Sequence, residues 1–359
     1  MSGDDETNQW ISIGAFTLEP ADRYTAGCSP RRINGLKHVC FWSLAHRQLS
    51  CNLDCDWFFQ EIMNATPYVS EKHISELCDY VLLEIFSYIS ALELAQSVAH
   101  VCTRWNNLLR QDCYIWRNKW LVWDVSYTVD DFQKVISSIP NLCSLKLYSS
   151  IAPEHVDAVG EILSSVSKLQ RLDLSLDHTN DELLQFITTH LQDFSVKHVS
   201  RQCYKKLSNF KNLTTLRLNT SYDFCGSHLR ELADSCPLLA KLSVLHSRGL
   251  TEGDVLYFIK RKRDTLEVLE VNGYGISDSV FLSLGHCKKL RHLRVIDARL
   301  MSEHTLQEII SLPRLKALNL SRLRLSREQL VSVGFTACKG RINTYLENES
   351  QSIVKFEFD

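Results

Sequence analysis

The sequence of 359 residues lacks several features that would indicate broad classes of protein. It has no run of about 18 apolar residues, so we expect no membrane-spanning helix. The first residues, MSGDDETNQW, contain neither a basic nor an apolar segment, and we therefore expect no secretory signal. A net charge of −2 and a pI near 6.7 give the chain no general attraction to nucleic acid or to an anionic membrane.

Sequence patterns typical of catalytic sites are missing as well. We find no glycine-rich loop of the kinds that bind phosphates or dinucleotides, and no H-E-x-x-H zinc pattern. Serines, histidines and acidic residues are numerous, so a chance pair among them does not identify a catalytic triad. We predict no catalytic residue, no metal ligand and no cofactor for this chain.

The 13 cysteines are odd in number and scattered, which favours reduced thiols in a cytoplasmic or nuclear protein over a disulfide framework. Six possible zinc ligands gather in the N-terminal extension, residues 1–70, whose fold we cannot assign. Their spacings contain no paired C-x-x-C, so a partly ordered extension is the alternative to a metal site. The six are Cys28, His38, Cys40, His46, Cys51 and Cys55.

An apolar pattern, L-x-x-L-x-L with conservative exchanges, recurs along the rest of the chain. Successive copies lie 22 to 27 residues apart, except for a final step of 38 residues. A period of about 20–29 residues is typical of leucine-rich repeats. The nine copies begin at Leu142, Leu169, Leu191, Leu213, Leu239, Leu266, Leu290, Leu315 and Ile353.

One repeat illustrates the expected structure. In a short strand, Leu172 and Leu174 point to one face and Asp173 to the other. A helical stretch follows each strand, and no single unit buries its own apolar face, so the stack is the folding unit. Cysteines just before a strand, as at Cys236 and Cys287, resemble the cysteine-containing class of leucine-rich repeat, and we expect them to be buried.

The fold class predicted for residues 121–359 is therefore α/β: a leucine-rich-repeat solenoid, in which a curved parallel sheet is backed by helices. Apolar residues at helical spacing between Val129 and Ile139 predict the helix of a capping first repeat.

Residues 71–120 predict a different, all-α unit. Val81, Leu82, Ile85, Phe86 and Ile89 have the spacing of one helix face, and Ser90 to Glu93 form a capping box for a second helix. The order of residue types resembles an F-box, through Ile74-Ser75-Glu76-Leu77, the segment 81–89, Val101-Cys102-x-Arg104-Trp105 and Asp112-x-x-x-Trp116-Arg117. One departure is Cys78, where the family usually has proline.

The F-box resemblance implies docking onto the Skp-family adaptor, and through it onto cullin and RING subunits of a ubiquitin ligase. The alternative is that these residues only pack the module's own core, as we expect of Val98, Val101, Trp105 and Trp116. The residues implied in adaptor binding are Leu77, Leu82, Leu83, Ile85, Phe86, Ile89, Leu92 and Leu94.

Residues that alternate with the core leucines are predicted to face a partner on the concave side of the sheet. Basic residues in consecutive repeats suggest a stripe that binds an acidic or phosphorylated protein segment, and the alternative is that they are simply solvated. The predicted substrate-binding residues are Lys146, Arg171, Asp173, Lys197, Arg217, Lys241, Glu270, His292 and Arg294.

An F-box followed by leucine-rich repeats is the architecture of substrate receptors, so the resemblance implies a non-catalytic subunit in ubiquitin-dependent degradation. Two other classes stay open. One is a scaffold or inhibitor that does not assemble a ligase, and the other is an enzyme housed in the N-terminal 70 residues.

Overall fold

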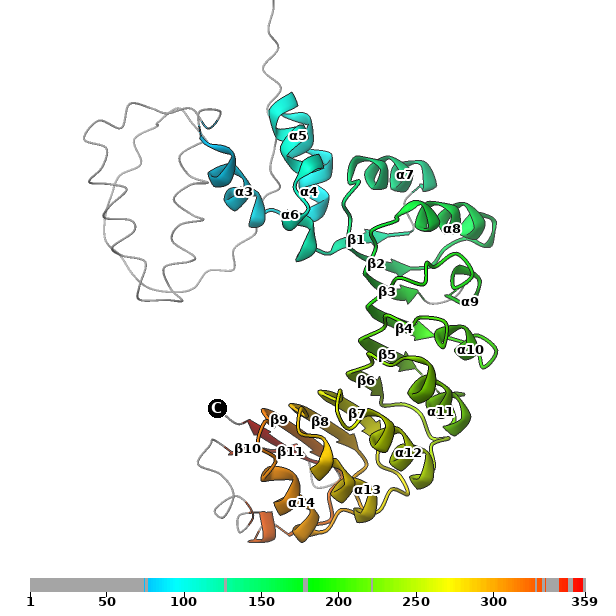
Figure 1. Cartoon of the computed structure of the whole chain (residues 1–359), viewed down its shortest axis with the longest axis vertical. Coiled ribbons are helices and arrows are strands. Elements are labelled where there is room, and N and C mark those ends of the chain that lie inside the picture. The colour runs from blue at the N-terminus through cyan, green and yellow to red at the C-terminus, as the bar shows by residue number, and fades with distance from the viewer. Residues whose placement is uncertain are drawn as a thin grey trace, which may run out of the picture. The chain divides into compact units, whose positions relative to one another are not determined.

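The computed structural model describes residues 74, 77–125, 128–176, 180–220, 222–326, 328–330, 333, 342–347 and 351–357 (Figure 1). The chain divides into two compact units, Met1–Leu108 and Leu109–Asp359. The possible zinc ligands of the N-terminal extension, together with Ser75, Glu76 and Phe358, lie outside the described residues. Among the described helices, none combines the length and the apolar character needed to cross a membrane.

The first unit is helical, as the spacing predicts. Its apolar side chains close on one another, and the rings of Phe86 and Trp105 meet edge to face with centroids 5.1 Å apart. The predicted capping box is present, because Ser90 accepts from the Glu93 amide and Glu93 accepts from the Ser90 amide. The elements are α3 (Asp79–Ser87), α4 (Ala91–Gln96), the 3₁₀ helix η2 (Val98–His100) and the start of α5 (Thr103–Gln111).

The second unit contains one sheet of eleven strands in the order β1 to β9, β11, β10. Strands β1 to β9 are all parallel, and helices cover one face of the sheet (Figure 1). The strands are β1 (Leu121–Asp124), β2 (Ser144–Ser149), β3 (Arg171–Leu176), β4 (Asp193–His198), β5 (Thr215–Thr220), β6 (Lys241–Val244), β7 (Val268–Asn272), β8 (His292–Ile296), β9 (Ala317–Ser321), β10 (Ile342–Glu347) and β11 (Gln351–Glu357).

The helices alternate with these strands and stack on one another. After α6 (Tyr114–Arg117) they are α7 (Val129–Ser138), η3 (Pro153–His155), α8 (Val156–Ser165), α9 (Asn180–Leu183), α10 (Tyr204–Leu207), α11 (Gly226–Ser235), α12 (Glu252–Lys262), α13 (Asp278–Ser283), η4 (Leu284–His286) and α14 (Glu303–Ile310). Helix α7 is the predicted helix of the capping first repeat, and it begins after Thr128, whose hydroxyl accepts from the Asp131 amide.

Alternation of buried and more exposed residues, as in β3, builds the core. Leu172 and Leu174 have no exposed surface, whereas Asp173 between them is half-buried. Consecutive strands are in register, so equivalent apolar residues form continuous rows between sheet and helices. The predicted burial of Cys236 and Cys287 is confirmed, and burial raises the pKa of the Cys287 thiol to about 11.

Two features of the array differ from the sequence prediction. Strand β1 was not predicted, because its four residues carry no L-x-x-L-x-L pattern; it nonetheless pairs in parallel with β2, Leu121 lying opposite Leu145. The ninth copy of the pattern, beginning at Ile353, is not a repeat. It belongs to β11, which pairs antiparallel with both β9 and β10, so an antiparallel hairpin ends the sheet.

Candidate interaction surfaces

The eight residues implied in adaptor binding divide into two groups by burial. Leu82, Phe86 and Leu94 are at most 1% exposed, so they pack inside the helical unit and offer no accessible surface. The other five keep part of their side chains at the surface, and their role in adaptor binding stays a prediction. These five are Leu77, Leu83, Ile85, Ile89 and Leu92.

The same helices expose residues that the sequence did not single out. Tyr80, the second residue of α3, is 77% exposed, and Tyr88, which directly follows α3, is 45% exposed. Val101, which we expected in the core, is 45% exposed, and Val98 is half-buried. Trp105 and Trp116 are buried as predicted, and the Trp116 indole donates to the Leu109 carbonyl at 2.7 Å.

Arg104 forms hydrogen bonds and an ion pair with residues at the beginning of α3. The Arg104 guanidinium donates to the Leu77 carbonyl at 2.6 Å and pairs with the Asp79 carboxylate at 2.5 Å. These contacts hold the backbone on both sides of Cys78, the position where an F-box usually has proline. Cys78 itself is the N-cap of α3, exposed, with φ −68° and ψ 158°. Because proline fixes φ near −65°, the cysteine has the backbone conformation that proline would impose.

Replacing Cys78 with proline should therefore raise the free energy of unfolding by roughly 0.4–1 kcal/mol, since the unfolded chain loses conformational freedom and the folded φ already fits. Thermal unfolding of the full chain, followed by circular dichroism, measures the change. The free energy of unfolding of Cys78→Pro is compared with that of Cys102→Pro, because Cys102 is also exposed and directly precedes a helix. A destabilised Cys78→Pro variant would contradict the account of this turn.

All nine predicted substrate-binding residues alternate with core residues and so lie on the face of the sheet opposite the helices. One of them, Lys197, does not lie at the same position along its strand as Asp173 and Arg217 do along theirs. Ser195, not Lys197, lies opposite both Asp173 and Arg217, and Lys197 lies two residues farther along β4. In the antiparallel strand β11, Lys355 lies opposite Asn319.

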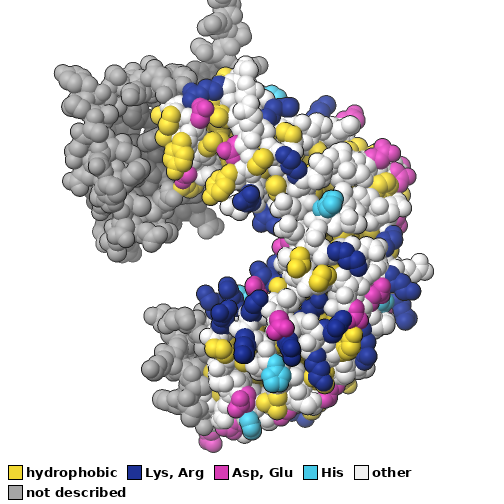
Figure 2. Space-filling view, in the orientation of Figure 1, with side chains coloured by type: hydrophobic (Ala, Val, Ile, Leu, Met, Phe, Trp, Pro, Cys, Tyr) yellow, Lys and Arg dark blue, Asp and Glu magenta, His cyan; other side chains and the backbone are white. Residues whose placement is uncertain are grey.

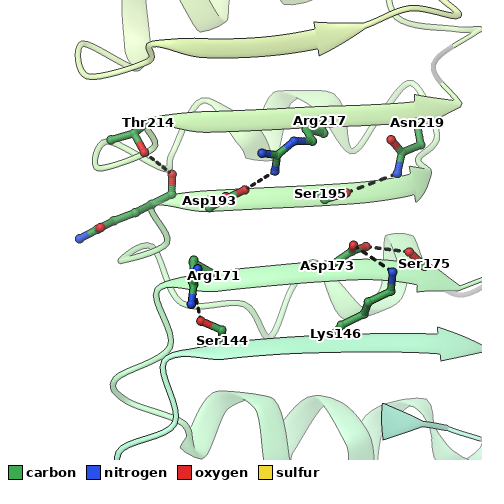
Figure 3. A network of polar contacts seen from close by, with 11 residues as sticks. Ser144, Lys146, Arg171, Asp173, Ser175, Asp193, Ser195, Thr214, Arg217 and Asn219 are labelled. Atoms are coloured by element: carbon green, nitrogen blue, oxygen red, sulfur yellow. Dashed lines mark hydrogen bonds and ion pairs between the residues drawn. The ribbon is translucent and has the colours of Figure 1, made fainter. Parts of the chain in front are cut away.

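The basic residues of strands β2, β3 and β5 contact neighbouring groups (Figure 3). Lys146 Nζ lies 3.5 Å from the Asp173 carboxylate, and Arg217 Nη1 lies 2.8 Å from that of Asp193. Arg171 stacks over Trp120, with its guanidinium carbon 5.0 Å from the ring centroid.

Arg171 also donates to neighbouring oxygens, to the Ser144 hydroxyl at 2.5 Å and to the Arg117 carbonyl at 2.6 Å. Its guanidinium therefore holds β3 to β2 and to the end of α6. Acids balance two residues of the predicted basic stripe, Lys146 and Arg217, within the sheet.

The predicted residues on strands β6 to β8 have other surroundings than those on β2 to β5. Glu270 accepts from the Ser243 hydroxyl at 2.6 Å, and Lys241 is half-buried. His292 and Arg294 on β8 are both exposed. Among the described residues, no group of three or more His, Cys, Asp or Glu side chains could hold a metal ion.

A family model matches the segment that contains the helices of the first unit. Residues 74–121 match the family model described as F-box-like. No curated protein sequence matches the chain.

Several solved structures resemble the chain, including the following two. One is the complex of Rad7 and Elc1 from yeast, with 15% identity, coverage of 79% of this chain and 72% of that chain, and a TM-score of 0.43. Another is the leucine-rich-repeat ectodomain of the Arabidopsis receptor kinase HAESA bound to a peptide hormone, with 17% identity, coverage of 50% and 33%, and a TM-score of 0.31. By its strand register and its family match, the chain is an F-box-like segment followed by a leucine-rich-repeat array.

Proposed function

We propose that this chain is the substrate receptor of a Skp–cullin–F-box ubiquitin ligase. The F-box-like segment would bind the Skp adaptor, and the repeat array would bind a protein substrate. The observation that carries the proposal is the F-box-like match over residues 74–121, placed directly before an array with an open strand face. The chain itself contributes no catalytic group in this proposal. It raises the effective concentration of the substrate near the charged enzyme.

The surface of the helical unit supports an adaptor contact. Leu83, Ile85 and Ile89 are only partly buried although α3 belongs to a small unit that has few apolar residues to spare. Partly accessible apolar side chains of this kind are available for contact with a partner protein. The exposed tyrosines at positions 80 and 88 add aromatic groups of the kind enriched at such interfaces.

A scaffold or inhibitor that does not assemble a ligase is the second candidate. The conformation of Cys78 bears on it, because the absence of the proline usual in an F-box keeps this alternative open. Since Cys78 already has a proline-like φ, the departure leaves the start of α3 in a normal shape. The F-box substrate receptor is therefore the function we put forward.

The double substitution Leu83→Ala and Ile85→Ala should lower capture of the Skp adaptor at least roughly tenfold, because truncation of two partly accessible apolar residues removes interface contacts. Co-purification of the full chain with the adaptor and cullin measures the loss. Val101→Ala is the matched control, since Val101 is an exposed aliphatic residue in the same unit outside the predicted contact. Undiminished capture by a folded double variant, or no capture by the unaltered chain, would reject the ligase proposal.

A further inference from the structure

Three arginines occupy equivalent positions in the loops that follow the strands. Arg248, Arg299 and Arg324 each lie four residues after the last core residue of β6, β8 and β9, which are Val244, Val295 and Leu320. These loops run side by side at the carboxyl ends of the parallel strands. The Ala298 amide, for example, donates to the Ser321 carbonyl at 2.9 Å.

The intervening loop, after β7, brings an aromatic residue into the same row. Tyr274 is 64% exposed and follows Gly273, whose amide donates to the Ile296 carbonyl at 2.6 Å. A Cβ at Gly273 would lie 2.6 Å from the Val295 side chain, so glycine permits this close approach of the two loops. Four consecutive repeats thus present arginine, tyrosine, arginine and arginine along one edge of the sheet.

A buried carboxylate fixes part of this row. The Asp297 side chain is 7% exposed and pairs with Arg299, whose Nε and Nη2 lie 2.6 and 3.0 Å from the two carboxylate oxygens. It also pairs with Arg322 at 3.3 Å. Each guanidinium has five donors, so both arginines keep donors for another anion while Asp297 restricts their orientation. One acid shared by two arginines leaves a net positive charge.

The backbone of these loops is held in an uncommon conformation. Asp297 and Arg322 occupy equivalent positions in consecutive repeats, and their φ angles are 65° and 56°. This left-handed region is tolerated by aspartate but is unusual for arginine. Ser149, at the equivalent position at the end of β2, has a φ of 75°, so this conformation recurs at strand ends of the array.

The basic groups of this edge are accessible. Arg248 and Arg324 are exposed, while the side chains of Arg299 and Arg322 are 39% and 44% exposed. The acids next along the chain accept hydrogen bonds from the helix side, Glu252 from Ser279 and Glu303 from Gln307. Lys and Arg side chains gather over strands β7 to β9 in the space-filling view (Figure 2).

We propose that the loops after β6, β8 and β9 bind an extended, acidic segment of a protein, through Arg248, Arg299, Arg322 and Arg324. The inference rests on the proposed function and names the chemical class of its substrate. Single positive charges spread over neighbouring repeats, about 4.8 Å apart per strand, suit a run of carboxylates better than one dianionic phosphate. The exposed ring of Tyr274 lies where the segment would cross β7.

The test uses the purified full chain and a fluorescein-labelled peptide of alternating glutamate and serine. The double variant Arg248→Glu and Arg324→Glu should weaken binding, measured by fluorescence anisotropy, at least roughly tenfold. Neither residue takes part in the Asp297 pairing, so the loops should keep their structure. The matched control is Lys260→Glu with Arg263→Glu, an equal change of charge at exposed residues around the end of α12, in the helix layer.

Retained binding by the control, and no binding of a peptide with glutamine in place of glutamate, support the proposal. Equal loss in both variants overturns it, because binding would then follow net charge alone. Stronger capture of a peptide in which phosphoserine replaces one glutamate, or of labelled oligouridine, also overturns it in favour of another ligand. Adaptor capture should be unchanged in both variants. The peptide test can therefore fail while the ligase proposal stands, and the ligase proposal can fail while the peptide test succeeds.

Discussion

Substituting Phe86 with alanine is expected to abolish the stable fold of the F-box-like helices. The side chain is 1% exposed and packs edge to face on Trp105. Removal of a buried phenylalanine costs about 3–5 kcal/mol, through lost burial and through the cavity that remains. A small helical unit has little stability in reserve, and a loss of this size exceeds it.

Hydrogen–deuterium exchange of the full chain separates this effect from any on the repeats. Peptides from residues 79–107 should lose their protection in the Phe86→Ala variant, while peptides from the strands β3 to β8 keep theirs. Tyr80→Ala, in the same helix but at a residue 77% exposed, should change protection little. Protection retained in Phe86→Ala would show that this residue does not hold the helices together.

This outcome also changes how adaptor binding should be probed. Leu82 and Phe86 match the F-box pattern, and from the sequence alone they were natural choices for interface substitutions. Because both are fully buried, their substitution would reduce adaptor capture by unfolding the unit, whatever the site of contact. Leu83 and Ile85 avoid this ambiguity, since part of each side chain reaches the surface.

The spacing of apolar residues was enough to predict most of the array, because each repeat needs the same buried positions. The prediction from apolar spacing failed where a strand has fewer apolar residues than a full repeat, and where a hairpin strand has the same alternation as a repeat. Strand β1 has two buried residues, Leu121 and Trp123, and no preceding leucine to mark it. The segment from Ile353 alternates as any half-buried strand does, and alternation alone does not distinguish a parallel repeat from a hairpin.

The candidate site was harder to predict than the fold. In β4, phenylalanine and valine replace the leucines, and Lys197 was assigned to the column that Ser195 occupies. The arginines at 248, 299 and 324 were not singled out, because loop residues have no periodic signal until the strand ends are known. Their pairing with Asp297 depends on loop conformations that a sequence pattern does not encode.

Substituting Gly226 with alanine should cost about 2–4 kcal/mol of stability in the array, although it adds a single methyl group. Gly226 is the first residue of α11, and a Cβ there would overlap the carboxylate of Asp254 on the next helix of the stack. Asp254 cannot move aside freely. It accepts from the Thr251 amide at 3.0 Å, capping α12, and from Arg230 Nε at 2.7 Å.

The charge of Asp254 adds a pH dependence to this prediction. Burial raises the pKa of the carboxyl group, but hydrogen bonds from Thr251 and Arg230 outweigh burial and hold the pKa below its ordinary value. The folded protein therefore binds this proton less readily than the unfolded chain. Asp254 contributes its stability above the ordinary pKa of an aspartate, and the contribution is lost as the pH falls through the lowered value.

Urea unfolding of the full chain, followed by circular dichroism, measures the effect. Gly285→Ala is the matched control, because a Cβ at that position meets no atom within 4 Å and its φ is not left-handed. The control should lie within about 0.5–1 kcal/mol of the unaltered chain, on the stabilising side. The gap between Gly226→Ala and the unaltered chain should be constant from pH 7 to pH 5 and narrow only in more acidic solution. Equal effects of the two alanines would mean that α11 and α12 do not depend on the contact at Asp254, and that the stack tolerates a wider spacing there.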